Sequence, residues 1–348
     1  MLFSILIPVY NVESYIETCI NSIIVQNFHD YEVIIVDDGS KDRSGEICDI
    51  YAQKYPDQIK VIHQENKGLL MARRVAIKKA TGKYLLFLDS DDAFTTECLN
   101  DINLVLTEHK GIDLLIFHAE TWDGKKTSNF SKPFKKKSDF LSFAEKKKYC
   151  SCLLRRKVPN CIWSKVVLRD IVDVDADYEK YKCVGIGEDL LQSLPLITRA
   201  ENIYYLNKNL YLYRTNNSSM THTFNFNMYQ SMRTVNCVLD KYAEFWLQEW
   251  NLDNAIELSA CNFMKSVWQV LKRLIISDEP LSSYRVRQTL YAIANDEWFK
   301  SQYLKSRRCI IFPIERIVLK LLIEVRIEQT ITCLNILRRC YNFIKKKG

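Results

Sequence analysis

The feature that most constrains the fold is an alternation of apolar runs and helical patterns over the first 120 residues. Each run is mostly apolar, which is typical of a strand buried on both faces. Between the runs, apolar residues recur every three or four positions, as in amphipathic helices. The runs are FSILIPV (3–9), YEVIIV (31–36), IKVIH (59–63), KYLLFL (83–88) and DLLIFH (113–118). This order predicts an α/β fold with an open, mostly parallel sheet flanked by helices.

Polar residues gather where these runs end. The carboxyl ends of parallel strands meet at one edge of a sheet, and ligands of such sheets bind there. The sequence therefore predicts a single binding site assembled from four clusters. They are Tyr10-Asn11, Asp37-Asp38-Gly39-Ser40, Asn66-Lys67-Gly68 and Asp89-Ser90-Asp91-Asp92.

The last cluster places three carboxylates within four positions, directly after a buried run. Like charges this close repel one another unless a cation is present. Mg²⁺ and Mn²⁺ prefer oxygen ligands and often share them with substrate phosphates. The pattern Asp-x-Asp therefore fits a site for a metal and a sugar. The plain alternative is a turn or a helix cap, where aspartate is common.

The second cluster also has two interpretations. Gly39 allows the chain to turn, and Ser40 can cap the helix that follows. These structural needs do not explain why two acids, Asp37 and Asp38, follow the apolar run. A carboxylate at this point can accept hydrogen bonds from the imide N–H of uracil or from ribose hydroxyls.

Three stretches in this order resemble the inverting family 2 glycosyltransferases of the GT-A fold, of the bacterial surface-polysaccharide type. The first runs from SILIPVYN to VDDGSKDRS (4–44), the second is NKGLLMARRVAIKKATGKYLLFLDSDD (66–92) and the third is GEDLLQSLPLI (187–197). The resemblance covers residues 1–215 and implies a GT-A (Rossmann-like) domain. Residues 1–110 would be its nucleotide-binding half and 111–215 its acceptor half. We expect a helical extension over 216–304 and a basic amphipathic tail over 305–348.

The resemblance implies a role for each matching residue. Asp38 matches the acid that contacts uracil, and Asp37 is its neighbour. The full set expected at the nucleotide-sugar site is Pro8, Val9, Tyr10, Asn11, Asp37, Asp38, Lys67, Gly68, Ala72, Arg73, Asp89 and Ser90. The donor that this set implies is a UDP-sugar, and the acceptor is a saccharide, either free or linked to a lipid.

Further matches concern the metal and the chemistry. Asp91 and Asp92 match the ligands of Mn²⁺ or Mg²⁺, a Lewis acid that stabilises a leaving diphosphate. Asp189, beside Glu188, matches the general base, which takes the proton of the acceptor hydroxyl in a single inverting displacement. The plain alternative for Asp189 is an acid in the first turn of a helix, favoured by the helix dipole. His222 has two interpretations. It could contact a phosphate or the metal, or it could be an ordinary exposed histidine.

Two departures from the family pattern stand out. Arg74 occupies a position where the resemblance predicts asparagine. The motif Q/R-x-x-R-W of processive members does not follow Asp189. We therefore expect a non-processive hexosyl- or N-acetylhexosaminyltransferase that adds one sugar at a time.

The net charge of +7 is concentrated at the end of the chain, because residues 305–348 hold eleven Lys or Arg and three acids. On a helical wheel, residues 316–345 predict one amphipathic helix, with Lys320 and Arg338 on its polar side and Val318 and Phe343 on its apolar side. Such a helix either lies on anionic lipid or packs on the protein itself. Arg326, on the apolar side, weakens the lipid interpretation. The chain lacks any recognised nucleic-acid-binding pattern.

The location is expected to be cytoplasmic, or peripheral on the inner face of the plasma membrane if the tail binds lipid. The first residues, MLFSILIPVYN, lack the basic segment of an export signal. No run reaches the ~18 apolar residues of a membrane-spanning helix.

Two other functions stay open. A sugar-phosphate nucleotidyltransferase also uses an α/β sheet and acidic metal ligands, but it would need a glycine-rich basic loop after the first strand, and PVYNVES has none. A non-catalytic module could bind anionic polymers or membranes through the tail. In that case the acids of the first 215 residues would have no role in the function.

Overall fold

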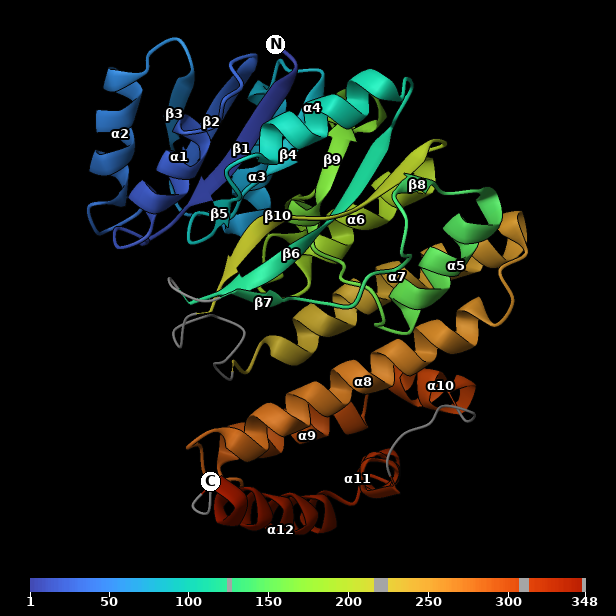
Figure 1. Cartoon of the computed structure of the whole chain (residues 1–348). Coiled ribbons are helices and arrows are strands. Elements are labelled where there is room, and N and C mark those ends of the chain that lie inside the picture. Colours follow the sequence, from blue (N-terminus) through green and yellow to red (C-terminus); the bar gives the residue numbers. More distant parts are fainter. Residues whose placement is uncertain (124–126, 216–224, 307–312, 346–348) are drawn as a thin grey trace. The chain divides into compact units, whose positions relative to one another are not determined.

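The computed structural model describes residues 1–123, 127–215, 225–306 and 313–345 (Figure 1). The chain forms two compact units. The first comprises residues 1–149 and 158–216, and the second comprises residues 150–157 and 217–348.

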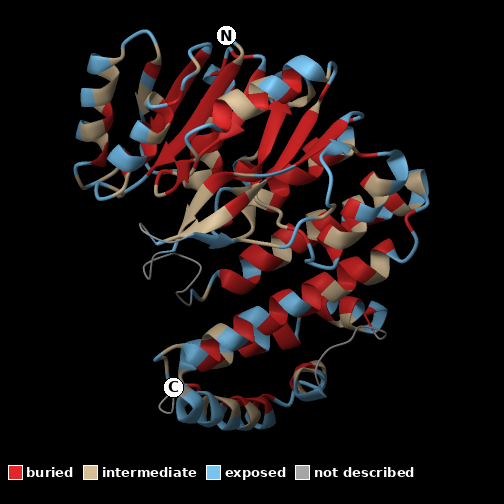
Figure 2. Cartoon of the chain, in the orientation of Figure 1, coloured by how far each residue is buried: buried red, intermediate tan, exposed pale blue. Residues whose placement is uncertain are grey.

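The first half of the first unit is a parallel sheet in the order β3-β2-β1-β4. Every residue of β1 and β2 is buried, because helices cover both faces (Figure 2). This half confirms the prediction of an α/β fold. Its strands are β1 (Phe3–Val9), β2 (Tyr31–Asp37), β3 (Ile59–His63) and β4 (Tyr84–Phe87), and its helices are α1 (Ile16–Ile24), α2 (Ser44–Lys54), α3 (Leu69–Lys79) and α4 (Cys98–Glu108).

The other half of the sheet is mixed, so the mostly parallel arrangement holds only for the first half. Strand β9 (Lys165–Leu168) lies antiparallel between β4 and β6 (Leu114–Trp122). Strand β10 (Ile203–Arg214) then pairs parallel with β6. The short strands β5, β7 and β8 pair antiparallel with these long ones. Their bounds are β5 (Ala93–Phe94), β7 (Thr127–Asn129) and β8 (Asp139–Phe140). Helix α6 (Glu188–Arg199) belongs to this half, whereas α5 (Phe143–Leu154) begins in it and belongs to the second unit from residue 150 onward.

The second unit is helical. Its core is apolar and aromatic, with Trp246, Phe263 and Phe299 fully buried. Arg156 joins residues 150–157 to α8, because its guanidinium donates hydrogen bonds to the side chain and the carbonyl of Asn262 (2.9 Å each). The helices are α7 (Met228–Trp250), α8 (Ala255–Ile276), α9 (Tyr284–Ala294), α10 (Glu297–Lys305), α11 (Pro313–Ile323) and α12 (Ile327–Lys345).

The single amphipathic helix predicted over 316–345 is wrong, because two helices occupy this range. Helix α11 ends at Ile323, and Val325 adopts a left-handed φ of 56°, which ends one helix before α12 begins. On the predicted apolar side, Val318 is fully buried, whereas Phe343 at the far end is exposed. Arg338, expected on the polar side, donates hydrogen bonds to the carbonyls of Leu274, Ile275 and Glu279 at the end of α8. The tail is therefore packed on its own unit up to about Arg338, and exposed apolar residues follow.

Among the described residues, no helix combines the length and the apolar character needed to cross a bilayer.

Candidate active site

The loop before α3 is held by Asp38. The buried carboxylate accepts hydrogen bonds from the backbone N–H groups of Lys67 (2.9 Å) and Gly68 (2.8 Å) and from Nε2 of Gln64 (2.6 Å). Gly68 has a φ of 89°, a backbone conformation that residues with a side chain rarely adopt. Asp38 thus shapes the start of α3 at the carboxyl edge of the sheet. Both oxygens of Asp38 already accept hydrogen bonds from this loop. The contact of Asp38 with uracil stays a prediction.

Asp37 is paired with a histidine that the sequence reasoning missed. Its carboxylate accepts from the backbone N–H of Ser40 (3.1 Å) and lies 2.9 Å from Nδ1 of His63, whose Nε2 lies 3.0 Å from Asp49. Burial raises the pKa of Asp37, but the bonds from Ser40 and His63 outweigh burial and leave this pKa below its usual value. Hydrogen bonds to Asp37 and Asp49 raise the pKa of His63. When both groups are charged, the pair of His63 and Asp37 therefore stabilises the loop.

The first and second clusters are joined at the same edge. Oδ1 of Asn11 accepts from the backbone N–H of Lys41 (2.7 Å), and the backbone N–H of Asn11 donates to Oγ of Ser40 (3.1 Å). Asn11 has a φ of 52°, which asparagine tolerates better than most residues. The ring of Tyr10 is exposed beside this junction. The edge therefore offers a flat aromatic surface next to fixed backbone.

Arg73 of α3 brings together acids that are far apart in sequence. Its Nη2 lies 2.6 Å from Oδ1 of Asp89, and its Nη1 lies 2.6 Å from Oδ1 of Asp189 and 3.7 Å from Glu188. The side chain is only 1% exposed. Burial lowers the pKa of Arg73, but the three carboxylates outweigh burial and raise it above its usual value. Arg73 is therefore a permanent cation between the end of β4 and the start of α6.

The Glu188-Asp189 pair lies in the first turn of α6. Gly187 precedes it with a left-handed φ of 88°, which allows the helix to begin at this point. Burial and the charge of Asp189 raise the pKa of Glu188 to about 7. Burial also raises the pKa of Asp189, although Arg73 opposes the shift. A carboxylate with a raised pKa is a stronger proton acceptor than an ordinary one.

Asp92 is bound by strand β10. Its Oδ2 accepts from the hydroxyl of Tyr211 (2.7 Å), and its Oδ1 accepts from the backbone N–H of Arg214 (2.7 Å). The Tyr211 oxygen in turn accepts from the backbone N–H of Asp89 (3.1 Å). Burial, with the charges of Asp91 and Asp89, raises the pKa of Asp92 well above its usual value. Burial and the neighbouring carboxylates therefore both oppose the charged form of Asp92.

The acid cluster fits a divalent cation only if the substrate completes the shell. Over residues 1–123, 127–215, 225–306 and 313–345, no three His, Cys, Asp or Glu side chains form a ready-made metal site. The cluster nevertheless supplies carboxylate oxygens, which Mg²⁺ and Mn²⁺ prefer, and a cation would offset its repulsion. Diphosphate oxygens and water would be the remaining ligands.

The other predicted residues occupy different environments around this edge. Pro8 and Val9 are buried at the end of β1, Ala72 and Ser90 are buried, and the Lys67 side chain is exposed. His222 lies outside the described residues.

Two groups beside the acids were not on the predicted list. The Arg214 guanidinium lies 4.2 Å from the ring centroid of Trp122 and 5.1 Å from that of Tyr15, and its Nε donates to the carbonyl of Asp91 (2.7 Å). Lys165 is fully buried with its amine on the carbonyl of Cys161. Burial lowers its pKa to about 8. The sequence carries one signal for each of these residues. Arg214 is a cation at the end of an apolar strand, and Lys165 is a cation at the start of one.

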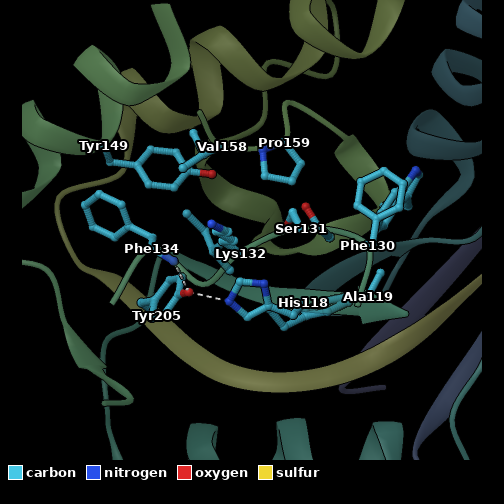
Figure 3. Close-up of a pocket in the computed structure, with 14 residues that line it drawn as sticks. His118, Ala119, Phe130, Ser131, Lys132, Phe134, Tyr149, Val158, Pro159 and Tyr205 are labelled. Carbon is cyan, nitrogen blue, oxygen red and sulfur yellow. Dashed lines mark hydrogen bonds between the residues drawn. The ribbon is translucent and has the colours of Figure 1, made fainter. Parts of the chain in front are cut away.

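An aromatic cavity lies in the second half of the first unit, lined in part by β6 and β10 (Figure 3). The hydroxyl of Tyr205 contacts Nε2 of His118 and accepts from the backbone N–H of Phe134 (2.6 Å). Burial lowers the pKa of His118. Trp163, another lining residue, stacks on Tyr211 with ring centroids 4.3 Å apart. One aromatic ring therefore separates this cavity from the residue that binds Asp92.

Comparison with known proteins shows which families and folds the chain resembles. Residues 4–164 match the family model described as Glycosyl transferase family 2. The uncharacterized glycosyltransferase EpsJ of Bacillus subtilis is 32% identical over 222 residues, which are 63% of this chain and 63% of EpsJ. The poly(ribitol-phosphate) beta-N-acetylglucosaminyltransferase TarS of Staphylococcus aureus is 37% identical over 118 residues, which are 33% of this chain and 21% of TarS. The chain thus spans less than two thirds of the length of either relative.

A solved structure resembles the chain over nearly its whole length. A crystal structure of S. aureus TarS 1-349 in complex with UDP has a TM-score of 0.65 at 21% identity, covering 97% of this chain and 92% of that one. Another, in complex with UDP-GlcNAc, has a TM-score of 0.64 at 20% identity. At this level of identity, the likeness shows a shared fold.

Proposed function

We propose that the first unit of this chain, which matches the glycosyltransferase family 2 model over residues 4–164, transfers one sugar at a time from a UDP-sugar to a saccharide hydroxyl, in the biosynthesis of a cell-surface polymer. The observation that carries the proposal is the Arg73 bridge between Asp89 and Asp189. It places the predicted sugar-binding acid and the predicted base on opposite sides of one guanidinium. A donor and an acceptor hydroxyl could meet beside this bridge, on the exposed side of the two acids.

Asp189 is proposed as the general base. It would take the proton of the acceptor hydroxyl while the hydroxyl oxygen bonds to the anomeric carbon and the bond from that carbon to the diphosphate breaks. A single displacement of this kind inverts the anomeric configuration. The raised pKa of Asp189 supports this role, since it makes the carboxylate a better proton acceptor. Glu188, with a pKa of about 7, would share the negative charge beside Arg73.

Asp91 is the residue that we propose holds the metal, with Asp92 beside it. Both oxygens of Asp92 already accept hydrogen bonds, which limits the share that Asp92 could take in binding a metal. A bound Mn²⁺ or Mg²⁺ would act as a Lewis acid on the diphosphate. Arg214 is held near by Trp122 and Tyr15 and would add a second positive charge on the leaving group.

The donor is proposed to be a UDP-hexose or a UDP-N-acetylhexosamine. Tyr10 offers an exposed ring for the base, and the junction of Asn11 with the loop after β2 fixes the backbone next to it. The backbone of Lys67 and Gly68 at the start of α3 would face the phosphates, as N-terminal N–H groups of helices do in anion sites. The likeness to a TarS structure that contains UDP-GlcNAc is consistent with this donor class.

The acceptor is proposed to be a saccharide, free or lipid-linked, that approaches from the aromatic cavity side. The cavity has room for little more than a water molecule, so a sugar would lie against its aromatic rim and not inside it. The cavity offers Phe134 and Trp163 as walls and His118 as a polar group (Figure 3). The exposed end of α12 is proposed to bring the protein to the cytoplasmic membrane surface, where a lipid-linked acceptor would lie.

The test is release of UDP from a panel of UDP-sugars, with Mn²⁺ and with EDTA. In Asp189→Asn we expect transfer to an acceptor to fall by about 10²- to 10⁴-fold, because the amide cannot take the proton. UDP binding, measured by calorimetry, should stay close to that of the wild type. Transfer by Asp189→Asn at the wild-type rate would exclude Asp189 as the base.

The same assay separates the other two functions. Release of pyrophosphate rather than UDP would indicate a nucleotidyltransferase. A protein that turns over no nucleotide sugar, yet binds anionic vesicles or polymers through its tail, would be the non-catalytic module.

A further inference from the structure

Arg74, the departure from the family pattern, makes an unusual set of contacts. Its Nη2 donates to the carbonyls of Asp173 (2.7 Å) and Val174 (2.8 Å). Its guanidinium lies 4.7 Å from the ring centroid of Tyr178. The residue is only 6% exposed, and no carboxylate of the described residues forms a salt bridge with it. Burial lowers the pKa of Arg74.

Burying a cation without a carboxylate partner is costly, so the contacts that compensate must be specific. A guanidinium carries several N–H donors on a long side chain, so it can donate to two carbonyls and still reach an aromatic ring. Asparagine, which the family pattern predicts here, has too short a side chain for the ring contact.

All these partners belong to the segment 172–187, which leads from the turn after β9 to the start of α6. The segment touches the site at two further points. The hydroxyl of Tyr178 donates to the carbonyl of Leu191 in α6 (3.4 Å). The carbonyl of Lys182 lies 3.6 Å from the position that a Cβ on Gly68 would take. The segment thus runs along α3 from Arg74 to the loop that precedes the helix.

The segment ends at Gly187, directly before Glu188 and Asp189. Two neighbouring arginines of α3 therefore both contact the start of α6 or the segment that leads to it. Arg73 binds Asp189 itself, and Arg74 binds the chain that leads to it.

We propose that Arg74 is a positioning residue, which fastens the segment 172–187 along α3 and so holds Asp189 at its place against Arg73. Only the expected fall in kcat rests on the proposed function. Whether Arg74 holds the segment 172–187 against α3 can be measured without any turnover.

Displacing a base by about 1 Å can cost on the order of 10²-fold in rate, although the residue changed does not touch the substrate. We therefore expect Arg74→Asn to lower kcat by roughly 10- to 100-fold, because Asp189 acts only in the transition state. The KM for the UDP-sugar should change by less than about threefold. Arg74→Lys keeps the charge and one donor group, and it should recover part of kcat.

The activity-independent readout is tryptic cleavage in the segment, which contains the exposed Lys180 and Lys182. We expect faster cleavage after these lysines in Arg74→Asn and in Tyr178→Leu than in the wild type, well below the melting temperature. Arg199→Asn is the matched control. It removes an exposed arginine that pairs with the side chain of Asp173 (3.5 Å), and an exposed pair of this kind contributes little.

The outcomes separate the two proposals. Wild-type kcat and wild-type cleavage in a folded Arg74→Asn would overturn the positioning role. A fall in melting temperature with an unchanged kcat and unchanged cleavage would reduce Arg74 to a stabilising residue, which also overturns it. If the wild type turns over no UDP-sugar, the proposed function fails, and the cleavage rates still decide whether Arg74 fastens the segment.

Discussion

At the scale of single residues, the site is defined by which acid each cation or hydroxyl binds. Tyr211 shows this best, because its one hydroxyl contacts both the Asp92 carboxylate and the backbone N–H of Asp89. The acids are therefore held by neutral donors and by Arg73, and each has a different environment. Differences in environment are what allow neighbouring carboxylates to take different chemical roles.

The pair of His63 and Asp37 gives a prediction about stability and pH. The pKa of His63 is raised in the folded protein, so the pair stabilises the fold fully below the ordinary pKa of histidine, and this stabilisation is lost as the pH rises through the raised pKa. His63→Gln should therefore lower the unfolding free energy more at about pH 5.5 than at about pH 8.5. Asp37 stays ionised over this range because its pKa is lowered.

The measurement is urea unfolding of both proteins at the two pH values. His29→Gln, at a histidine outside this site, is the control for a general effect of losing an imidazole. An equal loss of stability at both pH values would show that the imidazolium form is not what stabilises the loop.

At the scale of elements, the break between α11 and α12 departs most from the sequence pattern. Val325 is a β-branched residue in a left-handed conformation, which costs about 1–2 kcal/mol relative to a helical one. The packing on both sides explains why the chain accepts this cost. Leu322 is fully buried before the break, and Ile327 is buried after it.

Val325→Gly should therefore stabilise the second unit, by about 1 kcal/mol, because glycine adopts this φ without a steric penalty. Differential scanning calorimetry of the full chain would measure the shift in melting temperature. Val325→Ala, which keeps a Cβ, is the matched control and should give little of this gain. A lower melting temperature for Val325→Gly would mean that the packing of the valine outweighs its backbone strain.

At the scale of the whole molecule, the two units are expected to carry separable functions. The proposed chemistry uses residues of the first unit alone, whereas the exposed apolar end of the tail belongs to the second. Ile344 is 70% exposed and Phe343 is 61% exposed, in a segment that also carries basic residues. This combination is typical of helix ends that bind anionic lipid.

Deleting residues 339–348 should weaken sedimentation with phosphatidylglycerol vesicles while UDP release with a soluble acceptor stays within about twofold, because Arg338 and its contacts with α8 remain. Ile344→Ser, which keeps every charge, should lose part of the vesicle binding. Vesicle binding that is unchanged in both variants would show that the tail only packs on the protein.

The sequence by itself determined the α/β core and the edge where the acids lie. Strands buried on both faces need continuous apolar runs, and parallel strands align their ends, so both features are local and readable. Only the tertiary structure decided which groups meet. Arg73 bridges Asp89 and Asp189, Tyr211 binds Asp92, Arg74 holds the segment before α6, and β9 lies antiparallel within the sheet. These contacts join residues separated by up to 119 positions, and hydrophobic periodicity, which repeats every two to four residues, carries no information over such distances.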